Sequence, residues 1–239
     1  MKPELGSILG EIMAAASLDE IWLLLVRYFR QYGFGAVAYV LFDKGRRDQV
    51  VAFLEDGYPP AVVQTFVERG YGRHAPLLRL TMTSGRPQLA SHVLARNILS
   101  PEEQAHREAI KAAGLTEVLA LPAYGPAGRS ATVLLSEAHD RALYEEVDWS
   151  ELQIVAQAAH SRAYVVVPRR KTGMHGLSQR EVEILRWVAQ GKSNSVIADI
   201  LELAPGTVDT YLRRVFEKLD VSDRTSAAVR GVSMGLIRA

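Results

Sequence analysis

The chain of 239 residues contains no cysteine. It can therefore form no disulfide, no thiolate zinc site and no cysteine nucleophile. It also lacks a long hydrophobic run, because the apolar stretch at residues 21–26 is far shorter than the ~18 residues that cross a bilayer. Hydrophobic residues make up 48% and charged residues 23%, which excludes a disordered or collagen-like chain and leaves enough apolar material for a packed core.

Signals for export and for catalysis are missing as well. The start Met1-Lys2-Pro3-Glu4 has no basic region followed by an apolar core, so we expect a cytoplasmic protein with no membrane segment. The 6 histidines are scattered without an HExxH pair, and there is neither the Gly-Lys of a phosphate loop nor a GxSxG elbow. We therefore expect no catalytic residue, no metal site, no cofactor and no enzyme activity.

Charge is distributed unevenly along the chain. Residues 169–239 carry 12 Lys and Arg against 8 Asp and Glu, whereas residues 1–168 carry 16 against 19. The change falls at Pro168, in a basic segment that is unfavourable for helix. The predicted divisions are a first domain at 1–167, a linker at 168–176 and a second domain at 177–239. A basic module beside an acidic companion is typical of nucleic-acid-binding proteins, although an excess this small also fits an ordinary solvated surface.

The second domain begins with the pattern of two short helices. Ser178 and Glu181 have the capping-box spacing that starts a helix, and Gly191 suits the left-handed residue that ends it. Ser193 or Asn194 can cap the next helix. Its apolar positions are Val196, Ile197, Ile200 and Leu201, around the small Ala198.

Two further helices follow. Pro205 suits the first position of a third helix, whose apolar stripe is Val208, Leu212, Val215, Phe216 and Leu219. Ser222 can cap a fourth helix that ends at Gly235.

The other face of the third helix carries side chains that a DNA major groove accepts. Hydroxyl groups and lysine bind phosphates, and an arginine fork reaches the two acceptors of guanine. The side chains concerned are Thr207, Thr210, Tyr211, Arg213, Arg214 and Lys218. The same periodicity would also fit a four-helix dimerisation bundle with an ordinary solvated face.

The second domain resembles the helix-turn-helix domain of LuxR-type transcription regulators over roughly 60 residues. The motifs are LSQREVEILRWVAQGKSN at 177–194, IA at 197–198, TV at 207–208, LDVSDRT at 219–225 and GLI at 235–237. The resemblance implies a scaffold helix at 196–201 and a recognition helix at 207–218. The residues expected at a double-stranded DNA operator are Lys192, Ser193, Asn194, Thr207, Thr210, Tyr211, Arg213, Arg214, Lys218 and Arg224.

Three residues depart from the family pattern. Asp209 stands where the family usually has lysine or another neutral-to-basic residue, and a carboxylate facing phosphates weakens nonspecific affinity or redirects base preference. Glu202 replaces the usual connector glycine. Ala204 replaces the usual serine cap, a loss of ~1 kcal/mol.

The first domain alternates helical and strand patterns. Helices are expected at 18–32, 60–69, 101–113 and 145–165, and strands at 36–42, 49–54, 118–123 and 130–136. This order predicts an antiparallel sheet covered by helices on both faces, an α/β/α sandwich with room for an interior pocket. With the small all-α four-helix helix-turn-helix domain behind it, the predicted class is α+β.

The same order resembles the autoinducer-binding domain that precedes the DNA module in quorum-sensing LuxR-type regulators. The supporting stretches are GYPP at 57–60 through Phe66, RGY at 69–71, AP at 75–76 and RPQLA at 86–90. The ligand-pocket residues that the resemblance implies are Tyr58, Val62, Phe66, Tyr71, Ala75, Pro76, Ala90 and Leu134.

The pocket departs from the family pattern at the positions that contact the ligand. Family members that bind acyl-homoserine lactones place Trp, Tyr, Asp and Trp at the positions of Val62, Phe66, Ala75 and Ala90. Leu134 likewise replaces a hydroxyl residue, so these positions offer no partners for the lactone's polar groups. Each such group buried without a partner costs ~1–3 kcal/mol.

Three functional interpretations remain open. The protein is a DNA-binding regulator whose pocket takes a different, more apolar small signal molecule, or one whose pocket is filled by its own side chains and needs no ligand. Alternatively, it is an antiactivator that heterodimerises with a LuxR-type regulator and blocks DNA binding. The acidic Asp209 on the recognition helix favours this alternative. In the first two cases we expect a homodimer, because one short recognition helix needs a second half-site.

Overall fold

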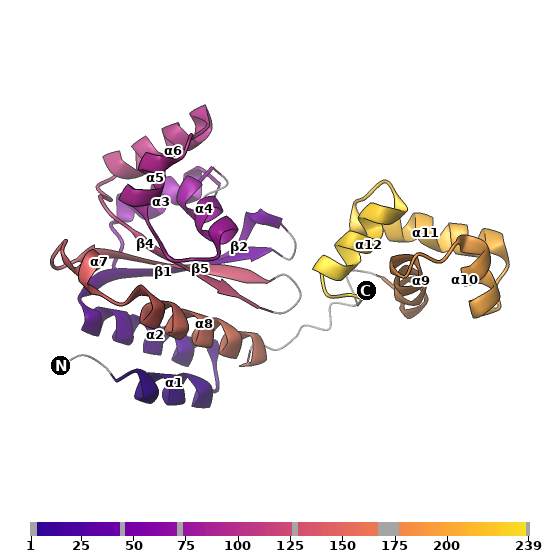
Figure 1. The fold of residues 1–239 in the computed structure, drawn as a ribbon, viewed down its shortest axis with the longest axis horizontal. Coiled ribbons are helices and arrows are strands. Elements are labelled where there is room, and N and C mark those ends of the chain that lie inside the picture. The colour runs from indigo at the N-terminus through magenta and orange to yellow at the C-terminus, as the bar shows by residue number, and fades with distance from the viewer. Residues whose placement is uncertain (1–3, 44–45, 71–73, 126–128, 167–176, 238–239) are drawn as a thin grey trace. The chain divides into compact units, whose positions relative to one another are not determined.

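The computed structural model describes residues 4–43, 46–70, 74–125, 129–166 and 177–237, which fall into two compact units (Figure 1). The first unit holds the described residues up to Val166 and the second holds those from Leu177. The predicted linker, 168–176, and the predicted pocket residue Tyr71 lie outside the described residues.

The first unit is built on a five-stranded sheet. The strands are β1 (Phe34–Asp43), β2 (Arg46–Asp56), β3 (Gln88–Leu89), β4 (Leu119–Tyr124) and β5 (Ser130–Ala138). They lie in the order β2-β1-β5-β4-β3, and every neighbouring pair is antiparallel. The predicted antiparallel sheet is confirmed: β1 and β2 form a hairpin, and β4 pairs with β5.

One face of the sheet is covered by α2 (Leu18–Tyr32) and α8 (Trp149–Val166), with α1 (Leu5–Ala14) as an outer layer on both helices (Figure 1). The bounds predicted for α2 are confirmed at both ends. The Ser17 hydroxyl accepts a hydrogen bond from the amide of Glu20, and Gly33 ends the helix with a left-handed φ of 106°. Phe29 and Leu152 are fully buried in the core that these helices form with the sheet.

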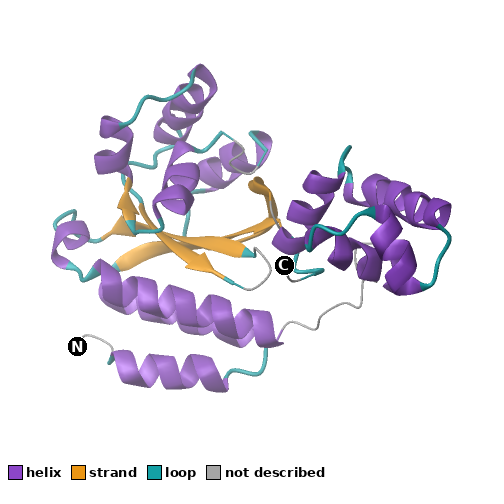
Figure 2. Cartoon of the chain, turned by 45° about the vertical axis from the view of Figure 1, so that its right-hand side comes forward, coloured by secondary structure: helices purple, strands orange, loops and turns teal. Residues whose placement is uncertain are grey.

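The other face carries α3 (Pro60–Glu68), α4 (Pro76–Ser84), α5 (Ala90–Arg96) and α6 (Pro101–Ala112). Figure 2 shows these short helices on the side of the sheet opposite α2 and α8. The sandwich predicted from the sequence is confirmed. Three helices were not expected from the pattern: α1, α4 and α5. For α4 a signal was available, since Pro76 occupies its first turn and Gly85 ends it with φ 69°.

The helix expected at 145–165 is wrong as a single element. The structure has a short α7 (Leu143–Glu146) and then α8, separated by Val147 in an extended conformation with ψ 146°. Asp148 explains the new start, because its carboxylate accepts a hydrogen bond of 2.9 Å from the amide of Ser150. Asp148 thus caps a helix from within a continuous helical pattern.

The second unit contains α9 (Gln179–Ala189), α10 (Asn194–Leu201), α11 (Pro205–Leu219) and α12 (Arg224–Ser233). The Ser178–Glu181 capping box is present in full, and Ser193, rather than Asn194, caps α10. The predicted cap of the fourth helix is wrong. Asp223, not Ser222, accepts the amide hydrogen of Ser226, and α12 ends two residues before Gly235. The predicted α+β class is confirmed.

Helix α10 is less buried than its apolar sequence pattern predicts. Ile197 and Ala198 are in the core, whereas Val196 and Ile200 are 40% and 42% exposed. None of the helices in the described ranges is long and apolar enough to span a membrane.

Candidate nucleic-acid interface and ligand cavity

α11 presents two different faces. Val208, Leu212, Val215 and Leu219 are buried against α9 and α10. Asp209, Thr210, Arg213, Arg214 and Lys218 lie on the exposed part of the same helix. The chain therefore holds a rigid helix by its apolar stripe and leaves a polar, mostly basic face open, as a major-groove reader requires.

The two neighbouring arginines on this face have different surroundings. The guanidinium carbon of Arg214 lies 5.9 Å from the ring centroid of Tyr211, a cation–π contact that limits where the side chain goes. Arg213 makes no ion pair and no hydrogen bond with another side chain of the described part. The geometry leaves Arg213 free to reach base edges and Arg214 oriented along the helix surface.

The N-terminus of α10 faces the recognition helix. The side-chain nitrogen Nδ2 of Asn194 donates a hydrogen bond of 2.5 Å to Oδ1 of Asp209. Thr210 is exposed, and its hydroxyl donates a bond of 3.0 Å to the carbonyl of Gly206 one turn earlier in α11. Arg224 donates a bond of 2.6 Å to the carbonyl of Lys192, which ties α12 to the loop before α10. Among the predicted DNA contacts, Arg224 thus also links two parts of the domain.

Lys218 has a structural partner that the sequence pattern did not reveal. Its ammonium group donates bonds of 2.9 and 2.8 Å to the two carboxylate oxygens of Glu181, which is only 2% exposed. Burial by itself would raise the pKa of Glu181. The hydrogen bonds from Lys218 and Ser178 outweigh burial and hold that pKa below its ordinary value of 4.5.

Lys218→Ala should destabilise the second unit by about 1–2 kcal/mol, because it leaves a buried carboxylate without its cation, although Lys218 is itself partly exposed. Hydrogen exchange of α9 and α11 amides should then be about 5–30-fold faster. Lys192→Ala, which removes an exposed lysine outside this pair, is the control. Equal exchange rates in the two variants would contradict the structural role of Lys218.

The first unit contains a cavity of about 240 Å³ between the sheet and helices α3–α6. Seven of the eight predicted pocket residues line it: Tyr58, Val62, Phe66, Ala75, Pro76, Ala90 and Leu134. Most of the remaining wall is also apolar, with Phe53, Val63, Leu94, Ile110, Leu115 and Val118. The residues that the resemblance implies thus lie together at one cavity, and the assignment of a ligand to it stays a prediction.

The polar residues that line the wall are Tyr58, Ser91, His106, Arg107, Lys111, Thr116 and Glu117. The hydroxyl of Tyr58 and Nδ1 of His106 are buried, and neither has a hydrogen-bond partner in the described ranges of the chain. Burial, with smaller contributions from Arg69 and His74, lowers the pKa of His106 to about 4, so the imidazole is neutral at pH 7. Glu117 is 5% exposed, and its Oε1 accepts a bond of 2.9 Å from the amide of Ser91.

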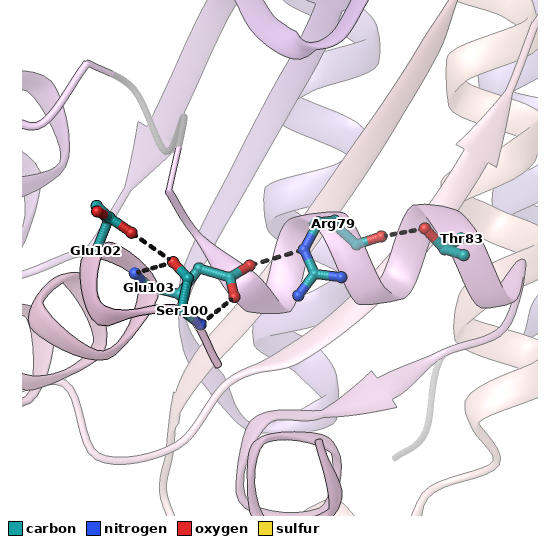
Figure 3. A network of polar contacts seen from close by, with 5 residues as sticks. All are labelled: Arg79, Thr83, Ser100, Glu102 and Glu103. Carbon is teal, nitrogen blue, oxygen red and sulfur yellow. Dashed lines mark hydrogen bonds and ion pairs between the residues drawn. The ribbon is translucent and has the colours of Figure 1, made fainter. Parts of the chain in front are cut away.

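His106 was missed in the sequence because it lies in a polar helix, PEEQAHREAIKA, with no distinctive spacing. A network of polar contacts fixes that helix beside α4 (Figure 3). Arg79 on α4 donates a hydrogen bond of 2.7 Å to Glu103, and Glu103 completes the capping box of α6 with Ser100. Both helices contribute to the cavity wall, so the network holds two of its sides together. No group of three or more metal-ligating side chains occurs in the described part of the chain.

A sandwich domain with an apolar cavity, followed by a four-helix unit with an exposed basic recognition helix, defines a ligand-cavity domain joined to a DNA-binding module. Residues 17–163 match the family model described as the autoinducer binding domain. Residues 175–230 match the model of bacterial regulatory proteins of the luxR family. The chain therefore belongs to the LuxR-type regulators, which are transcription regulators and not enzymes.

Relatives share both parts. The transcriptional activator protein AnoR of Acinetobacter nosocomialis is 25% identical over 96% of this chain and 97% of its own length. The quorum sensing-dependent regulator RpaR of Rhodopseudomonas palustris is 29% identical over 77% of this chain and 75% of its own. The crystal structure of Escherichia coli SdiA covers 98% of both chains with a TM-score of 0.72 and 20% identity, which shows the same fold. SdiA in complex with octanoyl-rac-glycerol gives a TM-score of 0.69, also at 20% identity, and covers 98% of this chain and 96% of its own.

Proposed function

We propose that this protein is a cytoplasmic, homodimeric regulator that binds a DNA operator through α11 and takes a small, mostly apolar signal molecule other than an acyl-homoserine lactone. The observation that carries the ligand assignment is the cavity of about 240 Å³ in which Val62, Ala75 and Ala90 stand where lactone-binding relatives have polar partners. An apolar cavity of ~150 Å³ is already large enough to bind a benzene-sized molecule.

The size of the cavity favours a ligand over a self-filled core. Protein interiors are close-packed, and a void of this size leaves its lining without contacts that a bound molecule would supply. The unpartnered atoms of Tyr58 and His106 point to one or two polar groups on an otherwise apolar molecule. SdiA, a relative in fold, is known in complex with octanoyl-rac-glycerol, an acyl chain on a polar head without a lactone ring.

Thermal unfolding tests the ligand assignment, with protein from a host that makes no lactone. We expect an extract of the native culture to raise Tm by several degrees, since saturation at 100 Kd stabilises by about 2.7 kcal/mol. An octanoyl lactone should have no such effect, and octanoylglycerol probes the acyl-chain chemistry. Ala75→Leu, which fills the cavity, should abolish the shift, while Ala112→Leu on the exposed face of α6 should keep it.

Two outcomes would contradict this part of the proposal. Stabilisation by the lactone at micromolar concentration would show that the substituted wall still recognises that ligand class. If no addition stabilises the protein and Ala75→Leu raises its Tm, the cavity is a packing defect of a ligand-independent regulator. A protein that selects no sequence from a randomised DNA pool under any of these conditions would instead be the antiactivator.

A further inference from the structure

Asp209 is an acidic side chain on the face of α11 that a DNA-binding module turns to the major groove. It is the fifth residue of α11 and is exposed. Residues near the N-terminus of a recognition helix are the ones that contact base edges. A carboxylate held at this place either meets phosphate oxygens, which repel it, or meets a hydrogen-bond donor on a base.

The carboxylate is held away from its natural partner on the helix. Asp209 and Arg213 are four residues apart, the spacing at which opposite charges pair on a helix surface. No ion pair between them is present in the described residues, and Oδ1 of Asp209 instead accepts the hydrogen bond of 2.5 Å from Asn194. Asn194 lies in the first turn of α10, so the contact joins the two helices of the helix-turn-helix.

The hydrogen bond from Asn194 to Asp209 carries a free-energy cost, which a contact that only joined the two helices would not need. Only the side-chain amide nitrogen of Asn194 can donate to a carboxylate, so its amide oxygen points elsewhere, where it is buried and has no partner among the residues that the structure describes. The arrangement keeps one carboxylate oxygen of Asp209 occupied and oriented. It leaves Oδ2 of Asp209 and the whole guanidinium of Arg213 available to another molecule.

From this geometry we infer that Asp209 reads a cytosine in each operator half-site by accepting a hydrogen bond from its N4 amino group, with Asn194 as the positioning residue. On its own major-groove edge, cytosine presents the N4 donor and no acceptor. Adenine pairs its amino donor with the N7 acceptor, and guanine presents two acceptors, both of which repel a carboxylate. The assignment rests on the proposed operator binding by α11.

The test uses the full chain with culture extract present. It begins with selection from a randomised DNA pool and continues with titration, at fixed salt, of the selected site and its single-base variants. The wild type should select cytosine at one position per half-site. Asp209→Ala should reduce the preference for that cytosine over the other bases by about 5-fold to 150-fold. Glu217→Ala, an exposed carboxylate two turns further along α11, should leave the preference unchanged.

Asn194→Ala should weaken the same cytosine preference, because Asp209 is then free to pair with Arg213. Tighter binding of Asp209→Ala to all sequences alike, with an unaltered motif, would overturn the assignment and leave Asp209 as a general repulsive charge. If the wild type selects no sequence, the proposed operator binding is itself wrong. If the wild type selects an operator motif that Asp209→Ala leaves unchanged, only the cytosine assignment fails.

Discussion

Replacing Arg213 and Arg214 together with alanine should lower the affinity for the selected operator by at least about 100-fold. A bidentate contact of arginine with guanine contributes ~1–3 kcal/mol of base discrimination, and a phosphate contact adds a salt-dependent term. Among the described residues Arg213 has no ion-pair or hydrogen-bond partner, and Arg214 is oriented by the ring of Tyr211. Loss of Arg213 should therefore relax specificity at one base, and loss of Arg214 should weaken binding to all sequences.

The salt dependence separates these two roles. Each lost phosphate contact should reduce the slope of log affinity against log salt by about 0.9, whereas a lost base contact should leave it almost unchanged. Arg186→Ala, an exposed arginine on α9, is the matched control and should retain operator binding. An antiactivator would give the opposite result: the double variant would still inhibit its partner regulator, and operator binding would be absent in the wild type as well.

The parts of the fold that the sequence predicted are those set by local signals. In α2 the Ser17 cap, the apolar stripe and Gly33 agree with one another, and the helix has the predicted bounds. The Ser178–Glu181 box is equally local. The single helix expected at 145–165 failed because Asp148 offers the backbone a competing cap in the middle of a helical pattern.

The candidate sites show a similar division. The cavity wall was found because Val62, Ala75 and Ala90 sit in stretches that resemble a known domain. His106 could not be found in this way, because its role depends on burial against residues distant in the chain. The contact of Lys218 with Glu181, 37 residues away, and that of Asn194 with Asp209 depend likewise on how helices pack. Periodicity indicates which face of a helix is polar but not which partner each polar group meets.

His106 should make the first unit lose stability as the pH falls from about 6.5 to about 4. The unfolded chain takes up a proton at the ordinary histidine pKa of 6.5, whereas the folded protein keeps the ring neutral down to a pKa of about 4. Between these values the unfolded state binds more protons, so the contribution is fully present above pH 6.5 and decreases below it. At pH 5 this coupling amounts to about 2 kcal/mol, roughly 30-fold in the unfolding equilibrium.

Comparison with His106→Gln isolates this effect. The other groups that titrate in this range are the same in both proteins and cancel: they are the carboxyl groups and the buried His160, whose pKa is also lowered by burial. The measurement is the ratio of hydrogen-exchange rates of the slowest β5 amides in the two proteins at pH 7.5 and at pH 5. We expect that ratio to shift by about 30-fold toward faster exchange in the wild type at pH 5, and exposed His92→Gln should show no shift relative to the wild type. A constant ratio would mean that the ring takes up its proton at the same pKa in the folded and the unfolded protein, which would contradict the expected shift. The cavity would then present a cation at pH 5, and an acidic signal molecule would fit it better there than a neutral one.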